Sequence, residues 1–283
     1  MKSIRYAIWN GEIVEANHPV FSLSSRIGQF GDALFETIRC EEGKPLWLSF
    51  HLARLNRSFK LLGWTPSQSW NAHFWKTQID TLLKQNAMPN ARLKIRVFRE
   101  AEGFYLPVNE HFVFSLTLSE LQDRQYVLPN KGVTLGVCPL FFKPHDITSV
   151  LKTTSSLLYV QAKIYAKNQG YDDVLLLNHY KRPCEASSSS WFWVVDDILY
   201  TPPLSEYPLQ GVMREVIIAK AKELHITCKQ EPAYPGILEQ AQEMFLCNTI
   251  QGIRWVGSFQ NKDFKLGPVT QRIAESIKKG NTI

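Results

Sequence analysis

The chain has 283 residues, of which 45% are hydrophobic, and a formal net charge of +6. This length and apolar content suffice for one large or two smaller α/β domains with a full hydrophobic core. The Lys and Arg residues are scattered rather than clustered, which favours attraction of small anions over a nucleic-acid-binding stripe. We therefore expect small-molecule chemistry and no nucleic-acid partner.

The cysteines and histidines argue against a metal site. The five cysteines are odd in number and far apart, and the seven histidines show no HExxH-like spacing. Such cysteines indicate reduced thiols in a cytoplasmic protein. Met1–Arg5 lacks the apolar core of a signal peptide, and no apolar run approaches the length of a membrane span, so no membrane partner is expected.

Residues 1–120 predict an α+β domain built from hairpins and two helices. Asn10-Gly11 is a strong hairpin signal because both turn positions accept positive φ. A second antiparallel pair is predicted where the strand ending at Arg39 turns at Glu42-Gly43 into Leu46–Leu48. The further predicted elements are strands over Ile4–Trp9, Glu12–Glu15, Arg92–Arg99 and His111–Leu118, helices over His51–Leu62 and Ser69–Gln85, and an irregular stretch over Phe21–Phe30.

A linker is predicted over residues 121–132, because this segment is polar and contains the breakers Pro129 to Gly132. Residues 133–283 then predict a second domain of α/β type. Its predicted strands are Val133–Leu140, Val174–Leu177, Trp191–Val195, Ile198–Tyr200, Glu243–Cys247 and Ile253–Val256, and its helices are Ser155–Asn168, Val212–Leu224 and Thr270–Lys279.

Lys152 and Glu185 are the candidate catalytic residues. A Lys near strand ends can be a nucleophilic amine that forms a Schiff base with a carbonyl compound. A Glu can pair with a ring-nitrogen cation, as a pyridoxal-type cofactor requires. An ordinary surface Lys and surface Glu would look the same in isolation, so the pair gains meaning only from the rest of the chain.

Three features suggest a phosphate group. Gly211 precedes the helix predicted from Val212, whose free backbone N–H groups and dipole favour an anion. Cys247 to Ile250 follow a buried strand and offer a hydroxyl and amides. Arg54, on the helix over His51–Leu62, adds a cation. Each feature alone is weak.

In combination, these segments resemble the fold-type IV pyridoxal-phosphate enzymes, which include the class IV aminotransferases and aminodeoxychorismate lyase. The resemblance covers nearly the whole chain, with its motifs in family order and a Lys-to-Glu gap of family size. The matching segments are Gln29–Arg39 (FGDGxFExIR), His51–Leu55 (HxxRL), Lys152, Cys184–Ser188 (TEGSS), Gly211–Arg214 (GITR) and Phe245–Ile250, the second phosphate loop.

The resemblance implies a two-domain fold, mixing α+β and α/β units, with pyridoxal 5'-phosphate bound between the domains, and a homodimer acting on a small-molecule amino substrate. It implies that Lys152 holds the cofactor as a Schiff base and shuttles the proton, while Glu185 keeps the pyridine nitrogen protonated. It further implies phosphate contacts from Arg54, Val212, Met213, Thr249 and Ile250, and a substrate pocket lined by Phe35.

Three departures from the family pattern matter. Met213 replaces the Thr of GITR, which removes one phosphate hydroxyl, and Ser190 replaces the Asn of SSSN. No Arg stands near Phe104, where D-amino-acid transaminases bind the substrate carboxylate. This last departure counts against that activity and leaves Arg96 or Arg99 as carboxylate ligands.

The second phosphate loop is the one discriminator between a lyase and a transaminase. Its Cys247-Asn248 matches the lyases, and Gly252 stands where transaminases carry Glu, whereas Thr249 matches the transaminases. The sequence therefore favours aminodeoxychorismate lyase, which releases pyruvate and 4-aminobenzoate in folate biosynthesis. One alternative is a class IV aminotransferase of amino-acid metabolism, acting on a branched-chain or other amino acid with a 2-oxo acid. The other is a non-catalytic family member, against which the presence of both Lys152 and Glu185 argues.

Overall fold

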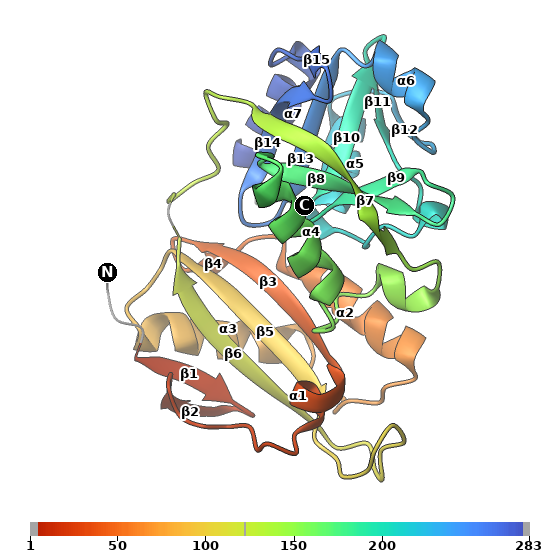
Figure 1. The fold of residues 1–283 in the computed structure, drawn as a ribbon. Coiled ribbons are helices and arrows are strands. Elements are labelled where there is room, and N and C mark those ends of the chain that lie inside the picture. The colour runs from red at the N-terminus through yellow and green to blue at the C-terminus, as the bar shows by residue number, and fades with distance from the viewer. Residues whose placement is uncertain (1–4, 122, 280–283) are drawn as a thin grey trace. The chain divides into compact units, whose positions relative to one another are not determined.

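The computed structural model describes residues 5–121 and 123–279, which divide into two compact units (Figure 1). Unit 1 comprises the first 124 residues together with Lys152–Ser155, and unit 2 comprises Gln125–Leu151 and Ser156–Ile283. The short segment that begins with Lys152 therefore groups with unit 1, although its chain neighbours on both sides group with unit 2.

Unit 1 is built on a six-stranded sheet with the order β2-β1-β6-β5-β3-β4. Strands β3, β5 and β6 pair in antiparallel fashion along their lengths, and side chains alternate between the two faces. The bounds are β1 Tyr6–Trp9, β2 Glu12–Glu15, β3 Ala33–Glu41, β4 Lys44–Pro45, β5 Ala91–Arg99 and β6 Phe112–Glu120. Ile4, where the first strand was predicted to begin, lies outside the described residues.

Two helices of unit 1 cover one face of this sheet: α2 (Leu48–Leu62) contacts β3, and α3 (Ala72–Gln85) contacts β1 and β6 (Figure 1). The predicted strand over Leu46–Leu48 is wrong. Trp47 adopts a left-handed conformation with φ of 56°, and α2 begins at Leu48. The physical reason is that Leu48 continues the apolar stripe of α2 by one turn, so helical periodicity outweighs the short alternation.

Two further boundaries in unit 1 differ from the sequence prediction. The stretch over Phe21–Phe30 is not wholly irregular, because α1 occupies Arg26–Phe30. Helix α3 begins at Ala72 rather than Ser69, because the side chain of Asn71 caps it by accepting a hydrogen bond from the N–H of Phe74 at 3.0 Å.

Unit 2 is built on a nine-stranded mixed sheet, in which eight strands follow the order β12-β11-β10-β13-β14-β7-β8-β9 and β15 pairs with β14. Parallel pairing joins β14 to β7 and β7 to β8. The bounds are β7 Val133–Lys143, β8 Asp173–Asn178, β9 Pro183–Ala186, β10 Ser190–Val195, β11 Ile198–Thr201, β12 Cys228–Gln230, β13 Glu243–Asn248, β14 Gly252–Phe259 and β15 Lys262–Asp263.

Helices pack against this sheet: α4 contacts β7 and β8, whereas α5 contacts β10 and β13 and α7 contacts β13 and β14 (Figure 1). Every residue of β10 is buried, which explains its apolar run from Trp191 to Val195. Trp191 and Trp193 stack at 4.7 Å between ring centroids within the core. The helices are α4 Leu157–Asn168, α5 Val212–Glu223, α6 Pro235–Gln240 and α7 Pro268–Lys279, with 3₁₀ turns at Ile147–Val150 and Leu204–Glu206.

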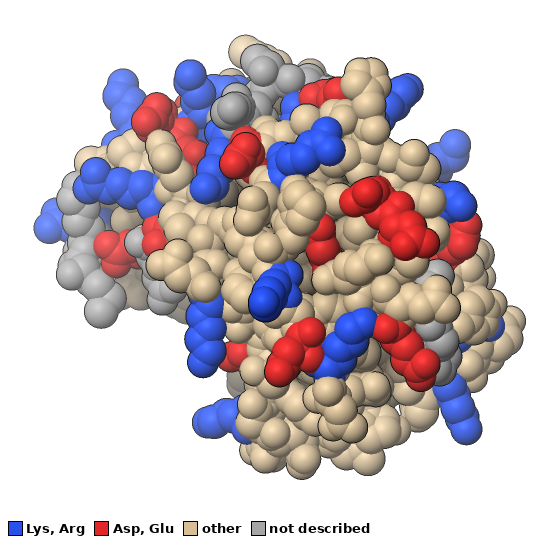
Figure 2. Space-filling view, turned by 90° about the horizontal axis from the view of Figure 1, so that it is seen from above, with Lys and Arg blue, Asp and Glu red and all other residues tan. Residues whose placement is uncertain are grey.

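The predicted fold class, a two-domain mixture of α+β and α/β architecture, is confirmed by the two sheets and their helices. On the face drawn in Figure 2, Lys and Arg side chains are interspersed with Asp and Glu. No helix within the described residues is long and apolar enough to span a membrane.

Candidate active site

Lys152 lies against the beginning of β3 in unit 1. The N–H of Phe35 donates to the carbonyl of Lys152 at 2.9 Å, and the N–H of Thr154 donates to the carbonyl of Ala33 at 3.0 Å. The Thr154 hydroxyl also donates to the carbonyl of Gly31 at 2.9 Å. The segment thus pairs with β3 like a short additional strand, which fixes the backbone from which the Lys152 amine projects.

Gly31 is required by this packing. It has a φ of 66°, and a Cβ at this position would lie 2.4 Å from the hydroxyl oxygen of Ser155. A larger residue would therefore push the Lys152–Ser155 segment away from β3. This requirement gives a physical reason for the glycine in the Gln29–Arg39 motif.

The ring of Phe35 lies beneath two ammonium groups. Nζ of Lys152 is 4.5 Å from its centroid and Nζ of Lys94 is 4.6 Å away, distances typical of cation–π contacts. Arg96 faces the same side of the sheet, because it pairs with Phe35 in register and is two residues from Lys94 on β5. This sheet face therefore concentrates positive charge around Phe35.

The two arginines predicted for the substrate lie on opposite faces of β5. Arg96 donates to the hydroxyl of Thr117 at 3.3 Å, and burial lowers its pKa. Arg99 instead lies 3.5 Å from Asp32 and 3.8 Å from Glu110. The structure therefore places Arg96, and not Arg99, with Phe35.

Sequence reasoning missed Lys94, although its position two residues before Arg96 in an alternating strand was a usable signal. Burial lowers the pKa of Lys94, and the neighbouring charges of Arg96 and Arg92 lower it further.

Arg54 is held by a buried carboxylate. Its Nε donates to Oε1 of Glu36 at 2.8 Å and its Nη2 donates to Oε2, forming a bidentate ion pair. Nδ1 of His51 lies 2.6 Å from Oε2 of the same carboxylate. Burial raises the pKa of Glu36, but the positive charge of Arg54 and the hydrogen bond from His51 outweigh it and lower this pKa to about 2.

His51 is buried, and burial lowers its pKa. Within the described residues, its Nε2 has no hydrogen-bond partner. A neutral imidazole that donates from Nδ1 to Glu36 keeps Nε2 as an acceptor. The Glu36 carboxylate thus binds one edge of the Arg54 guanidinium and fixes its direction. The same carboxylate also orients the ring of His51.

Glu185 lies on β9 in unit 2 and accepts three hydrogen bonds. Its Oε1 accepts from the hydroxyl of Tyr159 at 2.9 Å and lies 2.7 Å from Nζ of Lys143. Its Oε2 accepts from the N–H of Leu209 at 3.0 Å. A buried carboxylate that contacts one cation and two neutral donors is held in place.

Lys143 and Tyr159 were not predicted from the sequence. Nζ of Lys143 donates to the hydroxyl of Tyr159 at 2.6 Å and to the carbonyl of Ser149 at 2.8 Å. Burial raises the pKa of Tyr159 well above its ordinary value, and the negative charge of Glu185 raises it further, so the phenol remains a donor. No local motif marks this pair, because Lys143 and Glu185 are 42 residues apart.

The first turn of α5 offers backbone N–H groups from Val212 and Met213. Gly211 is the N-cap of α5 and has no side chain to satisfy them. A Cβ on Gly211 would lie 2.4 Å from the hydroxyl oxygen of Ser190, so a larger residue would have to displace this hydroxyl. Both side chains, Val212 and Met213, are buried, so only their backbone can bind an anion.

Residues Thr249 to Gln251 form the loop of the hairpin between β13 and β14. Gly252 closes this loop with φ of 69° and pairs with Asn248, as expected for a three-residue hairpin with a left-handed glycine. Oδ1 of Asn248 accepts from the N–H of Ile250 at 3.0 Å and from that of Gln251 at 2.8 Å. The carbonyl of Thr249 accepts from the hydroxyl of Tyr126 at 2.8 Å.

Each unit carries groups of the kind that a phosphorylated aldehyde with a basic ring nitrogen requires. In unit 1, Lys152 supplies an amine and Arg54 a cation, and in unit 2 Glu185 supplies an acceptor for a ring N–H. The α5 N-terminus and the Thr249 loop supply neutral donors of the kind that bind phosphate. Among the described residues, no group of three or more His, Cys, Asp or Glu is arranged to hold a metal ion.

Comparison with known proteins defines the class. The family model for amino-transferase class IV matches residues 33–259. The chain therefore belongs to the class IV aminotransferase family of pyridoxal-phosphate enzymes, which confirms the resemblance seen in the sequence. It is a pyridoxal-phosphate-dependent enzyme of that family.

Relatives span the whole chain. A D-alanine aminotransferase from Staphylococcus haemolyticus is 26% identical over 95% of each chain. A branched-chain-amino-acid aminotransferase from Salmonella typhimurium is 25% identical over 98% of this chain and 93% of its own.

Solved structures share the fold. A branched-chain aminotransferase from Escherichia coli has a TM-score of 0.87 at 23% identity, covering 97% of this chain and 94% of its own. A 4-amino-4-deoxychorismate lyase from Pseudomonas aeruginosa has a TM-score of 0.82 at 24% identity, covering 96% of this chain and 97% of its own. An aminotransferase and a lyase thus both have folds closely similar to this one.

Proposed function

We propose that the enzyme is an aminotransferase that moves an amino group between an anionic amino acid and a 2-oxo acid. The observation that carries this proposal is the Lys152 amine above the ring of Phe35, on a sheet face that also carries Lys94 and Arg96. Transfer is favoured over elimination by the full-length similarity to D-alanine and branched-chain aminotransferases.

Lys152 and Glu185 have complementary roles in this proposal. When bound, pyridoxal phosphate draws electrons away from the α-carbon of the substrate, so that its proton can be removed. Lys152 would hold the cofactor through its amine, and the free amine would accept this proton as a general base. Glu185 keeps a ring N–H in place, because Lys143, Tyr159 and Leu209 fix both of its oxygens.

The phosphate contacts are proposed to come from one charged group and several neutral donors. Arg54 supplies the charge, and the carboxylate of Glu36 sets its direction. The amides of Val212, Met213 and Thr249, with the Thr249 hydroxyl, supply the rest, and the Ile250 amide would share its N–H between the phosphate and Oδ1 of Asn248. Donors from one helical turn and one hairpin loop would therefore make up for the hydroxyl that the family's usual Thr supplies and that Met213 lacks.

The substrate's carboxylate is proposed to bind at Lys94 and Arg96. Both are partly buried, and both have pKa values lowered chiefly by burial, so an anion that lies between them would relieve the repulsion of two cations. Phe35 would contribute its ring to the apolar part of the substrate. Arg99, predicted from the sequence as an alternative, is instead compensated by Asp32.

A second candidate is the lyase reaction on aminodeoxychorismate, which the sequence favoured. Gly252 supports it, because this residue stands where the family's transaminases carry Glu. Its φ is 69°, and a Cβ there would lie 2.8 Å from the Tyr126 ring, so the loop is built around the absence of a side chain. Asn248, shared with lyases, shapes the same loop.

Parallel assays on purified enzyme loaded with pyridoxal phosphate test this choice. One assay follows amino transfer from a panel of L- and D-amino acids to 2-oxoglutarate or pyruvate, and the other follows release of 4-aminobenzoate and pyruvate from aminodeoxychorismate. We expect turnover in the first assay, fastest with an acidic amino acid as donor. Turnover in the second assay alone would replace the transaminase by the lyase.

We also propose a homodimer in which an apolar loop of one copy contacts the other. Phe104, Tyr105 and Leu106 are 86%, 89% and 83% exposed, which is unusual for three consecutive large apolar residues. Arg26 holds this loop in one shape, because its guanidinium donates to the carbonyls of Gly103 and Phe104 at 3.1 and 2.5 Å. Light scattering on the purified enzyme would give twice the chain mass.

The cellular setting is proposed to be the cytoplasm. All five cysteines are unbridged, and four of them are buried, which suits a reducing compartment.

A further inference from the structure

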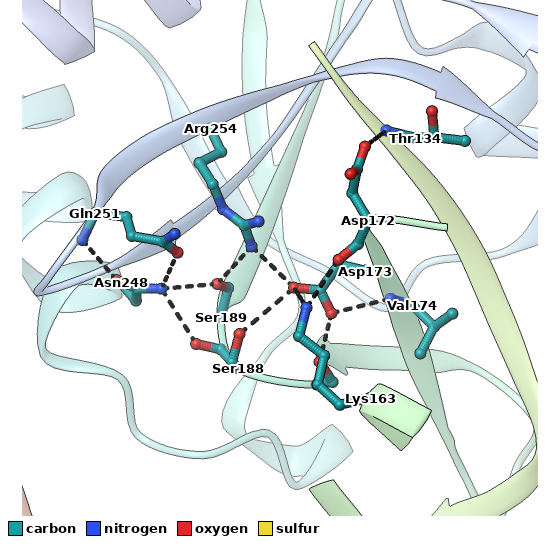
Figure 3. A network of polar contacts seen from close by, with 11 residues as sticks. Thr134, Lys163, Asp172, Asp173, Val174, Ser188, Ser189, Asn248, Gln251 and Arg254 are labelled. Atoms are coloured by element: carbon teal, nitrogen blue, oxygen red, sulfur yellow. Dashed lines mark hydrogen bonds and ion pairs between the residues drawn. The ribbon is translucent and has the colours of Figure 1, made fainter. Parts of the chain in front are cut away.

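A buried ionic network joins three segments of unit 2 that are far apart in the sequence (Figure 3). At its centre is Asp173, the first residue of β8, which is fully buried. Its Oδ2 lies 2.8 Å from Nη2 of Arg254 on β14 and 3.2 Å from Nζ of Lys163 on α4. Its Oδ1 accepts from the hydroxyl of Ser187 at 2.5 Å and from the N–H of Val174 at 2.9 Å.

The pKa of Asp173 shows that its partners stabilise the charged carboxylate. Burial alone raises the pKa of Asp173, but Lys163, Ser187 and Arg254 together lower it below its ordinary value. A buried carboxylate is stable only where cations and hydrogen-bond donors compensate it, so any displacement of Arg254 or Ser187 is costly. The network therefore fixes these two groups relative to β8.

Arg254 also contacts the turn that follows Glu185. Nη2 of Arg254 also lies 3.4 Å from the hydroxyl oxygen of Ser189. The turn from Ser187 to Ser189 is closed by a hydrogen bond from the N–H of Ala186 to the carbonyl of Ser189 at 2.8 Å. Ala186 directly follows Glu185, so the turn and the end of β9 are held together.

Asn248 connects this turn to the hairpin loop that begins at Thr249. Its Nδ2 donates to the hydroxyl of Ser189 at 3.2 Å and to the carbonyl of Ser188 at 3.4 Å. Its Oδ1 accepts from the loop amides of Ile250 and Gln251. One amide side chain thus bridges the two segments (Figure 3).

We propose that Asp173, Arg254 and Asn248 are positioning residues that set the enzyme's affinity for the phosphate group of its cofactor. They act by holding the Thr249–Ile250 loop against the Ser187–Ser189 turn, so that the loop and the Thr249 groups at its start already have their shape before the anion binds. Preorganised donors bind an anion more tightly than mobile ones, because less order is lost on binding. This inference rests on the phosphate contacts proposed above for Thr249 and Ile250.

The test compares two ligands that differ only in the phosphate, pyridoxal phosphate and pyridoxal. The variants are Asn248→Ala, which removes the bridge, and Arg254→Met, which removes the guanidinium but keeps much of its apolar stem. Each is expected to weaken pyridoxal phosphate by roughly tenfold or more, since one or two hydrogen bonds are lost. Pyridoxal should bind each variant about as well as wild type, because it makes no phosphate contact.

Two control variants separate positioning from general loss of stability. Lys163→Met removes a half-exposed cation from Asp173 but no contact to Ser189 or Asn248. Asn71→Ala removes an equivalent hydrogen bond in unit 1, which the Asn71 side chain accepts from a backbone N–H. Both are expected to lower the melting temperature of the cofactor-free enzyme and to leave the affinity ratio of the two ligands unchanged.

The inference is overturned if Asn248→Ala and Arg254→Met keep the wild-type affinity ratio, or if they weaken both ligands equally. Asp173→Asn serves as a third variant, with the same expected ratio if it folds. If wild-type enzyme bound pyridoxal phosphate no more tightly than pyridoxal, the proposed phosphate contacts themselves would be wrong. That outcome is distinguishable, because it appears before any variant is made.

Discussion

The carbonyl of Lys152 accepts a hydrogen bond from the N–H of Phe35 at 2.9 Å, and the Lys152 ammonium lies 4.5 Å from the centre of the Phe35 ring. One residue thus fixes both ends of the lysine, its backbone through pairing and its amine through a cation–π contact. The candidate nucleophile and a candidate substrate contact therefore belong to one local structure in unit 1.

Lys152→Ala is expected to abolish turnover, because no other described amine is paired to β3 in this way. Wild-type enzyme mixed with pyridoxal phosphate should show a visible absorbance band that borohydride bleaches, with the cofactor then attached to Lys152 by mass spectrometry. Lys76→Gln, which changes an exposed lysine paired with Asp80, is the control and should keep the band. An adduct on Lys143 in the wild type would refute the assignment of Lys152.

Glu185→Gln is expected to keep the cofactor bound while the rate falls by roughly a hundredfold or more, since an electrostatic contact to the ring is lost. A Gln retains one acceptor oxygen, so either Lys143 and Tyr159 or the N–H of Leu209 must face an N–H₂ group. Turnover number and cofactor affinity, measured separately, check this split.

The control for Glu185 is Glu223→Gln, which changes a half-exposed carboxylate paired with Lys220 and should keep the wild-type rate. Full activity in Glu185→Gln would mean that another group contacts the ring nitrogen.

Glu36 should make the free energy of unfolding depend on pH in the acid range. Its pKa in the folded enzyme is about 2, against an ordinary value of 4.5, because Arg54 and His51 stabilise the carboxylate. A lowered folded-state pKa contributes stability that is complete above about pH 4.5 and is lost as the pH falls towards 2, roughly 3 kcal/mol in all. Urea unfolding at several pH values measures this slope.

In Glu36→Gln this part of the acid dependence should disappear, so the profile between pH 4.5 and 2 becomes flatter. At neutral pH the variant should be less stable by roughly 3–5 kcal/mol, because the Arg54 charge stays buried without its partner. An unchanged slope would show that the ion pair with Arg54 does not form in solution.

Lys94→Met and Arg96→Met are each expected to raise KM for an acidic amino acid by roughly tenfold, the effect of losing one charge-assisted hydrogen bond. The turnover number should change less, since neither residue contacts the reacting carbon. Arg99→Gln is the matched comparison on the opposite face of β5: it should lower stability through Asp32 while KM stays near wild type. The reverse pattern would move the carboxylate site to Arg99.

The sequence by itself determined the candidate catalytic residues and most of the elements that hold them. The motifs around Phe35, Lys152 and Glu185 follow one another along the chain in family order, and the family model confirms the class that they indicate. Periodicity located the main helices and strands, because the burial of one face repeats along the chain every 2 or 3.6 residues. It failed at Leu46–Leu48, a run predicted as a strand, whose last residue begins α2.

Only the tertiary structure decided which charges meet. Lys143 reaches Glu185 across 42 residues and Arg254 reaches Asp173 across 81, and neither pairing leaves a local pattern in the sequence. Likewise, Arg96 and Arg99 look equivalent in the chain, but the pleat of β5 turns one towards Phe35 and the other towards Asp32. Periodicity records how deeply each residue is buried, whereas the partners of a buried charge depend on which strands the topology makes neighbours.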